Sequence, residues 1–195
     1  MKQIISISRQ YGSGGHEIGK KLAEKLGYAF YDKEILANVA RKMNICQAVL
    51  AESDESQTNS LLYSVVMRNN RSASFEERLA KQERHYLRQQ AEKGSCVIIG
   101  RCANYVFRHD PGLMSIFISA PLPARVERIM ERYHLSAEEA RRQIHTTDKK
   151  RANYYNYQTD AKWSDISQYH LVIDRTLFGV DKTVDLLAQL VAERE

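Results

Sequence analysis

The sequence lacks several features that would mark a membrane, secreted or metal-binding protein. No apolar run approaches the length of a transmembrane helix, and the start of the chain leads into a strand pattern rather than into the apolar core of a signal peptide. The three cysteines, Cys46, Cys96 and Cys102, are odd in number and show no metal-ligand spacing. We therefore expect reduced thiols, a cytoplasmic location and no membrane partner.

Basic tails, internal repeats and low-complexity segments are also missing. The formal net charge is +5, but 29 basic and 24 acidic side chains are interspersed along the chain. The positive balance favours an anionic ligand, and the absence of a basic block disfavours nucleic acid. The length of 195 residues and the hydrophobic content of 43% suit one domain with a sizeable core.

One stretch near the N-terminus, residues 4–19, organises the chain. It begins with a short β-branched run, continues through a glycine-rich turn at residues 12–15 and ends in a helical pattern. Because glycine has no Cβ, backbone N–H groups of such a turn can approach an anion closely, and the following helix adds the positive end of its dipole. The alternative is a strand–helix connection whose glycines serve packing only. The predicted phosphate-binding residues are Gly12, Ser13, Gly14, Gly15, His16 and Glu17.

The turn fits the phosphate-loop template G-x-x-x-x-G-K-[ST] imperfectly. If Gly14 is the second glycine of the template, Arg9 occupies the position of the first. Gly15 then replaces the lysine, and His16 replaces the hydroxyl residue.

Short apolar runs alternate with helical patterns along the rest of the chain, which predicts an α/β fold with a five-stranded parallel sheet and right-handed crossovers. The expected strands are residues 4–7, 28–31, 95–99, 113–118 and 169–173. Helices are expected up to residue 26, over 34–43 and 75–93, after Pro121, after a capping box at Ser136 and Glu139, and over 180–191. The pattern weakens between residues 44 and 74, which indicates an insertion of the kind that covers substrates.

Two charged residues follow expected strands. Asp32 could bind a substrate hydroxyl or a magnesium-bound water, or cap the next helix, and both roles can coexist. Arg101 follows a continuous apolar strand, where its charge is destabilising unless it meets an anion. We expect Arg101 to bind phosphate, and the alternative is an internal salt bridge.

A basic and aromatic arm follows the fourth expected strand. Its first helix carries Arg125, Arg128 and Arg132 on one stripe, and these side chains could close over a triphosphate or be merely solvated. The aromatic tract over residues 153–157 and Trp163 is expected to pack the arm onto the body of the protein.

The chain resembles the cytidylate kinase-like family, which contains P-loop proteins related to the nucleoside monophosphate kinases. The resemblance is carried by residues 8–18, 97–103, 148–152 and 169–174. It implies a three-layer P-loop kinase fold over residues 1–195, with a five-stranded parallel sheet and helices on both faces. It also implies an acceptor-binding insert at residues 44–74, a lid at 133–165, and a cleft for ATP, Mg²⁺ and an acceptor monophosphate.

The resemblance also assigns an acceptor site. In cytidylate kinases an Asp-x-x-Arg of the lid holds the acceptor nucleotide, and this motif matches Asp148 and Arg151. A Gly-Arg-Asp after the third strand matches Gly100 and Arg101, but Cys102 replaces the aspartate that helps to read cytosine. A further lid arginine of cytidylate kinases falls at Ile144.

The largest departure from the family concerns the cation of the turn. The P-loop lysine, which neutralises the transferring phosphoryl group, is replaced by Gly15, and the magnesium-binding threonine is replaced by Glu17. Glu17 is accordingly the predicted metal ligand. The predicted catalytic cation is Arg9, which lies on the loop itself, and the alternatives are His16, Lys20 and the lid arginines Arg125 and Arg128.

These features together predict a phosphotransferase that moves the γ-phosphate of ATP to a small phosphorylated or hydroxylated acceptor. The missing lysine supports a rival reading, a nucleotide sensor without chemistry. A nucleic-acid-binding protein is a second rival, which the scattered charge disfavours.

Overall fold

The computed structural model describes residues 2–32, 35 and 73–194. The chain forms two compact units, Met1–Phe30 with Gly94–Glu195, and Tyr31–Lys93. Most of the predicted insert and of the helix expected over 34–43 lies outside the described residues. The single domain with an insert and a lid therefore stays a prediction.

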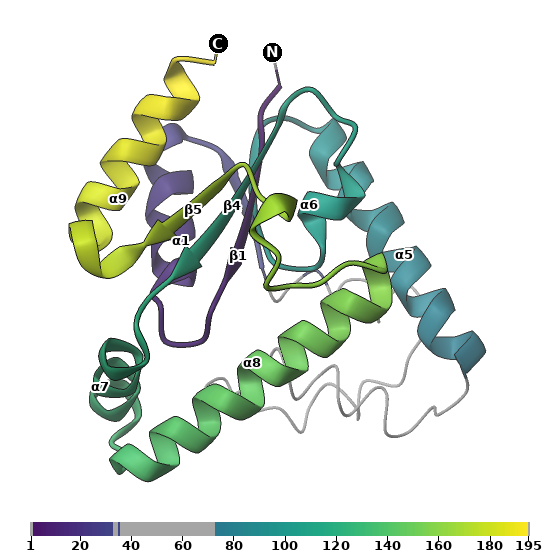
Figure 1. Ribbon diagram of the computed structural model, residues 1–195. Coiled ribbons are helices and arrows are strands. Elements are labelled where there is room, and N and C mark those ends of the chain that lie inside the picture. Colours follow the sequence, from purple (N-terminus) through teal and green to yellow (C-terminus); the bar gives the residue numbers. More distant parts are fainter. Residues whose placement is uncertain (1, 33–34, 36–72, 195) are drawn as a thin grey trace. The chain divides into compact units, whose positions relative to one another are not determined.

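The first unit is built on a parallel sheet with β1 at its centre (Figure 1). The strands are β1 (Ile4–Arg9), β2 (Ala29–Tyr31), β3 (Cys96–Ile99), β4 (Leu113–Ser119) and β5 (Leu171–Asp174), in the order β2-β3-β1-β4-β5. β1 pairs in parallel with β3 and β4, and β4 pairs in parallel with β5. The predicted five-stranded sheet is confirmed, and the carboxyl ends of its strands share one edge, where ligands bind in folds of this class.

Helices connect these strands in the expected alternation. They are α1 (Gly15–Leu26), α5 (Ala73–Glu92), α6 (Ala103–Val106), α7 (Leu122–Tyr133), α8 (Ala137–Thr159) and α9 (Arg175–Ala192), with a 3₁₀ turn at Ile166–Gln168. In the first unit, α1 and α9 lie on one side of the sheet and α6 lies on the other (Figure 1). None of the described helices is long and apolar enough to cross a membrane.

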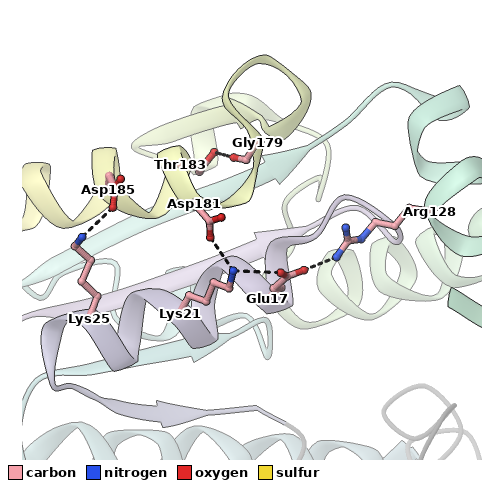
Figure 2. Close-up of polar contacts among 8 residues, drawn as sticks. All are labelled: Glu17, Lys21, Lys25, Arg128, Gly179, Asp181, Thr183 and Asp185. Atoms are coloured by element: carbon pink, nitrogen blue, oxygen red, sulfur yellow. Dashed lines mark hydrogen bonds and ion pairs between the residues drawn. The ribbon is translucent and has the colours of Figure 1, made fainter. Parts of the chain in front are cut away.

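The core lies between the sheet and the α1–α9 pair. Side chains alternate along a strand, so Ile5 and Ile7 of β1 face this core together with Val97 and Ile99, their partners on β3. Ile116 of β4, the partner of Ile7, joins the same cluster. Salt bridges flank the helix pair at the surface, where Lys21 meets Asp181 and Lys25 meets Asp185 (Figure 2). Their N–O distances are 2.7 and 2.8 Å, respectively.

The arm packs onto the opposite face of the sheet, as expected. Phe117 of β4 contacts the rings of Trp163 and Tyr169, with centroids 5.2 and 4.9 Å away. Tyr155 of α8 accepts a hydrogen bond of 2.8 Å from the Asn104 side chain on α6. The aromatic tract therefore fixes α8 to the sheet and to α6 within the first unit.

Helices α7 and α8 form a hairpin with its own small core of Val126, Ile129, Ala140 and Ile144. Ile144 is 2% exposed. The position at which cytidylate kinases carry a lid arginine therefore belongs to the interior of the hairpin in this chain.

Several predicted boundaries were wrong by a few residues. α5 begins at Ala73, two residues before the expected start at residue 75. α9 begins directly after β5 and accommodates a break at Gly179, whose φ of 74° is left-handed. The capping box of Ser136 and Glu139 is confirmed by bonds in both directions. The four-residue helix α6 was missed because it is too short to show a hydrophobic period.

Candidate phosphate-binding site

The turn between β1 and α1 is shaped by left-handed glycines. Gly12 and Gly14 have φ values of 82° and 84°, which other residues rarely adopt. Gly14 is the N-cap of α1 and offers no side chain to the first turn of the helix. The leading N–H groups of α1 have no acceptor within the helix, so they are available to an anion.

An ion pair from the α7–α8 hairpin holds this turn. The Asp148 carboxylate accepts a 2.7 Å hydrogen bond from the Tyr11 amide and a second 2.7 Å bond from Nη1 of Arg125. Arg125 also donates to the carbonyl oxygens of Tyr11 and Ala120. The two charged side chains are only 10% and 19% exposed. Arg125 and Asp148 thus bind the glycine turn to the hairpin.

Arg151 strengthens the same attachment. Its Nη1 donates a 2.8 Å hydrogen bond to the carbonyl of Arg9, and its guanidinium carbon lies 5.5 Å from the centroid of the Tyr11 ring. Asp148 and Arg151, which the family pattern assigns to the acceptor, therefore both contact the backbone of the turn. Their roles toward an acceptor stay predictions.

The Arg9 side chain fills the space next to Gly15. A Cβ placed on Gly15 would lie 2.5 Å from the Arg9 Cβ, and one placed on Gly100 would lie 2.5 Å from the Arg9 Nη1. The Arg9 guanidinium accordingly lies beside the end of β3. Because even a methyl group at position 15 would collide with Arg9, the packing of the turn leaves no room for a lysine side chain at this position.

Two other arginines border Gly14. A Cβ on Gly14 would lie 3.6 Å from the Arg175 Nε and 3.7 Å from the Arg128 guanidinium carbon. Arg175 Nε donates a 3.1 Å hydrogen bond to the carbonyl of Ser13. Arg175 was not among the site residues predicted from the sequence. Its place directly after β5, at the ligand-binding edge of a parallel sheet, is the signal that could have identified it.

Glu17, in the first turn of α1, lies between two cations (Figure 2). Its carboxylate is 2.5 Å from Nη2 of Arg128 and 3.6 Å from Nζ of Lys21. Burial acts to raise the pKa of Glu17, but the hydrogen bonds and charges of Arg128 and Lys21 outweigh it, so the pKa is lowered. The carboxylate is therefore ionised at neutral pH. Its predicted role as a metal ligand would require exchange with these cations.

The turn after β3 is the second unusual backbone segment. Gly100, Arg101 and Cys102 have successive φ values of 69°, 55° and 52°, although only the first is glycine. Left-handed conformations of non-glycine residues cost about 1–2 kcal/mol each and cluster at functional sites. The Arg101 guanidinium carbon lies 6.0 Å from the centroid of the Tyr154 ring of α8. This turn and the Arg9 guanidinium thus meet at one end of the sheet.

The remaining predicted residues have different settings. His16 is exposed and meets the Phe30 ring edge-on at 5.7 Å. Asp32 belongs to the second unit, so its acceptor role stays a prediction. Among the described residues no three His, Cys, Asp or Glu side chains cluster as a metal site, and Cys96 and Cys102 are buried free thiols. Burial raises the pKa of the Cys96 thiol to about 11.

A model of the cytidylate kinase-like family matches residues 4–177. The chain belongs to this family. It is 28% identical over 193 residues to a cytidylate kinase of Methanopyrus kandleri, a match that covers 94% of this chain and 90% of that protein. A cytidylate kinase of Methanosarcina barkeri is 26% identical over 197 residues, with 94% and 93% covered.

Solved structures share the fold of this chain. An uncharacterized protein from Eubacterium ventriosum is 28% identical and superposes with a TM-score of 0.76, over 98% of this chain and 99% of that one. Shikimate kinase from Bacteroides thetaiotaomicron is 15% identical with a TM-score of 0.59, over 98% and 99%. The second likeness shows the fold alone, which is that of the P-loop kinases. Family and fold together support a nucleotide kinase-like function.

Proposed function

We propose that the protein is an ATP-dependent phosphotransferase of the monophosphate kinase type. The observation that carries the proposal is the glycine turn, where uncapped N–H groups of α1 and two guanidinium groups converge around Gly14. N–H donors and arginines together bind phosphate oxygens well. Membership of a family whose named relatives are cytidylate kinases supports this class of reaction.

In the proposed reaction an oxygen of the acceptor forms a bond to the γ-phosphorus of ATP. The bond from that phosphorus to the β,γ-bridging oxygen breaks at the same centre, and ADP leaves with the electron pair. The protein contributes position and charge rather than a covalent nucleophile. The ion pair of Arg125 and Asp148 would keep the turn in its binding conformation.

Magnesium is the expected cofactor of this reaction. When bound, it would neutralise charge on the β- and γ-phosphates. Glu17 is the carboxylate at the turn, and carboxylate oxygens suit this ion. We retain Glu17 as the proposed protein ligand of magnesium. Its carboxylate would become available to the ion once Arg128 leaves it and binds the phosphates.

We place the acceptor at the turn after β3. Arg101 has the backbone strain expected of a functional residue, and the Arg9 guanidinium lies beside Gly100. Two guanidinium groups at one end of the sheet suit an acceptor that carries a phosphate, as a nucleoside monophosphate does. Asp32, Asp148 and Arg151 are retained as further acceptor contacts.

The test is a panel of nucleoside monophosphates and small hydroxylated acids, each incubated with ATP and magnesium. We expect ATP to raise the melting temperature and one class of acceptor to be phosphorylated. Arg101→Ala should raise the KM of that acceptor about 10- to 100-fold, which corresponds to the loss of one charge-assisted contact, with little effect on the KM of ATP.

Arg108→Ala is the matched control, because Arg108 is exposed and its guanidinium contacts the carbonyl and the ring of the nearby Tyr105. Equal changes in both KM values for Arg101→Ala would contradict the acceptor site. Binding of ATP without turnover of any acceptor would instead identify a nucleotide sensor.

A further inference from the structure

The chain has no P-loop lysine, so another cation must neutralise the negative charge of a bound triphosphate. Arg9 and Arg125 are the obvious substitutes in the sequence, but both are engaged elsewhere. The Arg9 guanidinium lies beside Gly100, and Arg125 binds Asp148 and two backbone carbonyls. The three heavy atoms nearest to a Cβ placed on Gly14, at the N-terminus of α1, belong to Arg175 and Arg128 instead.

We propose that Arg175, with Arg128 beside it, supplies to the triphosphate the positive charge that the lysine supplies in other P-loop kinases. The cation then comes from the junction of β5 and α9, more than 150 residues away along the chain, rather than from the loop. This inference rests on the proposed function, because it takes the anion at the turn to be the triphosphate of ATP.

The hydrogen bonding of Arg175 fits this role. Nε is fixed by the carbonyl of Ser13, which orients the planar guanidinium beside Gly14. Within the part of the chain that the structure describes, neither terminal amino group makes a hydrogen bond or an ion pair. The side chain is also half-buried. An oriented guanidinium whose two terminal nitrogens keep their N–H donors for a ligand is suited to bind phosphate oxygens in a bidentate manner.

Arg128 is the second cation, but its charge is balanced by Glu17 (Figure 2). A triphosphate at the turn would compete with Glu17 for Arg128, and Glu17 would keep Lys21 as its partner. Since the charge of Arg175 has no such competitor among the described residues, Arg175 is the stronger phosphate ligand of the two.

The experiment compares Arg175→Gln and Arg175→Lys with Lys182→Gln, an exposed charge farther along α9. Glutamine retains an amide donor for the Ser13 carbonyl but removes the charge. Calorimetry would measure the dissociation constants of ATP, ADP, adenosine and magnesium tripolyphosphate for each protein, together with the melting temperature without ligand.

We expect Arg175→Gln to weaken ATP and tripolyphosphate binding about 10- to 100-fold, with adenosine binding and the ligand-free melting temperature unchanged. Arg175→Lys should fall between wild type and glutamine, and Lys182→Gln should match wild type. Phosphate affinity equal in Arg175→Gln and Lys182→Gln would overturn the inference. A lower melting temperature with adenosine and ATP weakened alike would overturn it too, by indicating a structural role through Ser13.

The outcomes also separate this inference from the proposed function. If wild type binds ATP without turnover and Arg175→Gln loses phosphate affinity, the phosphotransferase is refuted and the role of Arg175 is upheld. If wild type turns over and Arg175→Gln binds ATP normally, the reverse holds. If wild type binds neither ATP nor tripolyphosphate, both are overturned.

Discussion

The glycine turn is contacted by two pairs of arginines that differ in what they bind. The anchoring pair, Arg125 and Arg151, donates to Asp148 and to backbone carbonyls of the turn. The bordering pair, Arg128 and Arg175, lies around Gly14 and leaves part of its donor capacity for other partners. The same residue type thus mainly holds the turn in one case and is mainly offered to the triphosphate in the other.

This difference follows from burial and from the available carboxylates. The ion pair of Arg125 and Asp148 is 10% and 19% exposed, so separating the two charges would leave one of them poorly solvated. The pair of Arg128 and Glu17 is 26% and 39% exposed, so an incoming anion can replace the carboxylate at a smaller free-energy cost. We expect substitutions of the anchoring arginines, or of their partner Asp148, to affect folding and substitutions of the bordering arginines to affect binding.

The largest effect on stability should come from Asp148→Ala. The substitution leaves the Arg125 guanidinium without its carboxylate and removes the acceptor of the Tyr11 amide. Loss of one partner from a buried ion pair costs about 3–5 kcal/mol of unfolding free energy. Urea denaturation followed by circular dichroism measures this change.

Glu138→Ala, on the same helix, is the matched control. Glu138 forms an exposed ion pair with Arg142, and its removal should change the unfolding free energy by less than about 1 kcal/mol. If Asp148→Ala were no more harmful than Glu138→Ala, the distinction between anchoring and bordering pairs would fail.

A smaller loss should follow Gly15→Ala. The new methyl group would lie 2.5 Å from the Arg9 Cβ and 3.2 Å from the Ile118 Cβ, so the strand or the helix must shift. Overpacking of this kind costs about 1–3 kcal/mol, measured again by urea denaturation. Lys20→Ala, on the exposed face of α1, should stay within about 0.5 kcal/mol of wild type. A stable Gly15→Ala protein would remove the steric reason for the missing lysine.

The sequence predicted the architecture well because apolar runs indicate buried strands and capping residues indicate helix ends. The short β-branched run over Ile4 to Ile7 and the capping box at Ser136 identified β1 and the start of α8 correctly. The glycine turn was identified for a similar reason, since φ values near 80° at Gly12 and Gly14 require that residue type.

Partner choice among the arginines was not predictable in the same way. A long flexible side chain on the loop, such as Arg9, can reach several sites, and its neighbours in the sequence do not decide among them. The contacts that decide join distant positions, such as Tyr11 with Asp148 and Ser13 with Arg175. These distant positions become neighbours only in the folded chain.

The smallest predicted effect is the loss of stability when acid protonates Glu17, the partner of the bordering arginine Arg128. Since contacts with Arg128 and Lys21 lower the pKa of Glu17 below its value of 4.5 in the unfolded chain, the ionised form is favoured in the folded state. The stability from this carboxylate is therefore fully present above about pH 4.5 and is lost as pH falls through the lower folded pKa. Because the Glu17 side chain is 39% exposed, its contribution should stay below about 1 kcal/mol.

Unfolding free energies measured between pH 3 and pH 6 should fall less steeply with acid in Glu17→Gln than in wild type. Glu24→Gln, an exposed substitution on the same helix, should keep the wild-type slope. A slope for Glu17→Gln that matches wild type would show that Arg128 is already unbound in solution, and both bordering arginines would then face the ligand from the start.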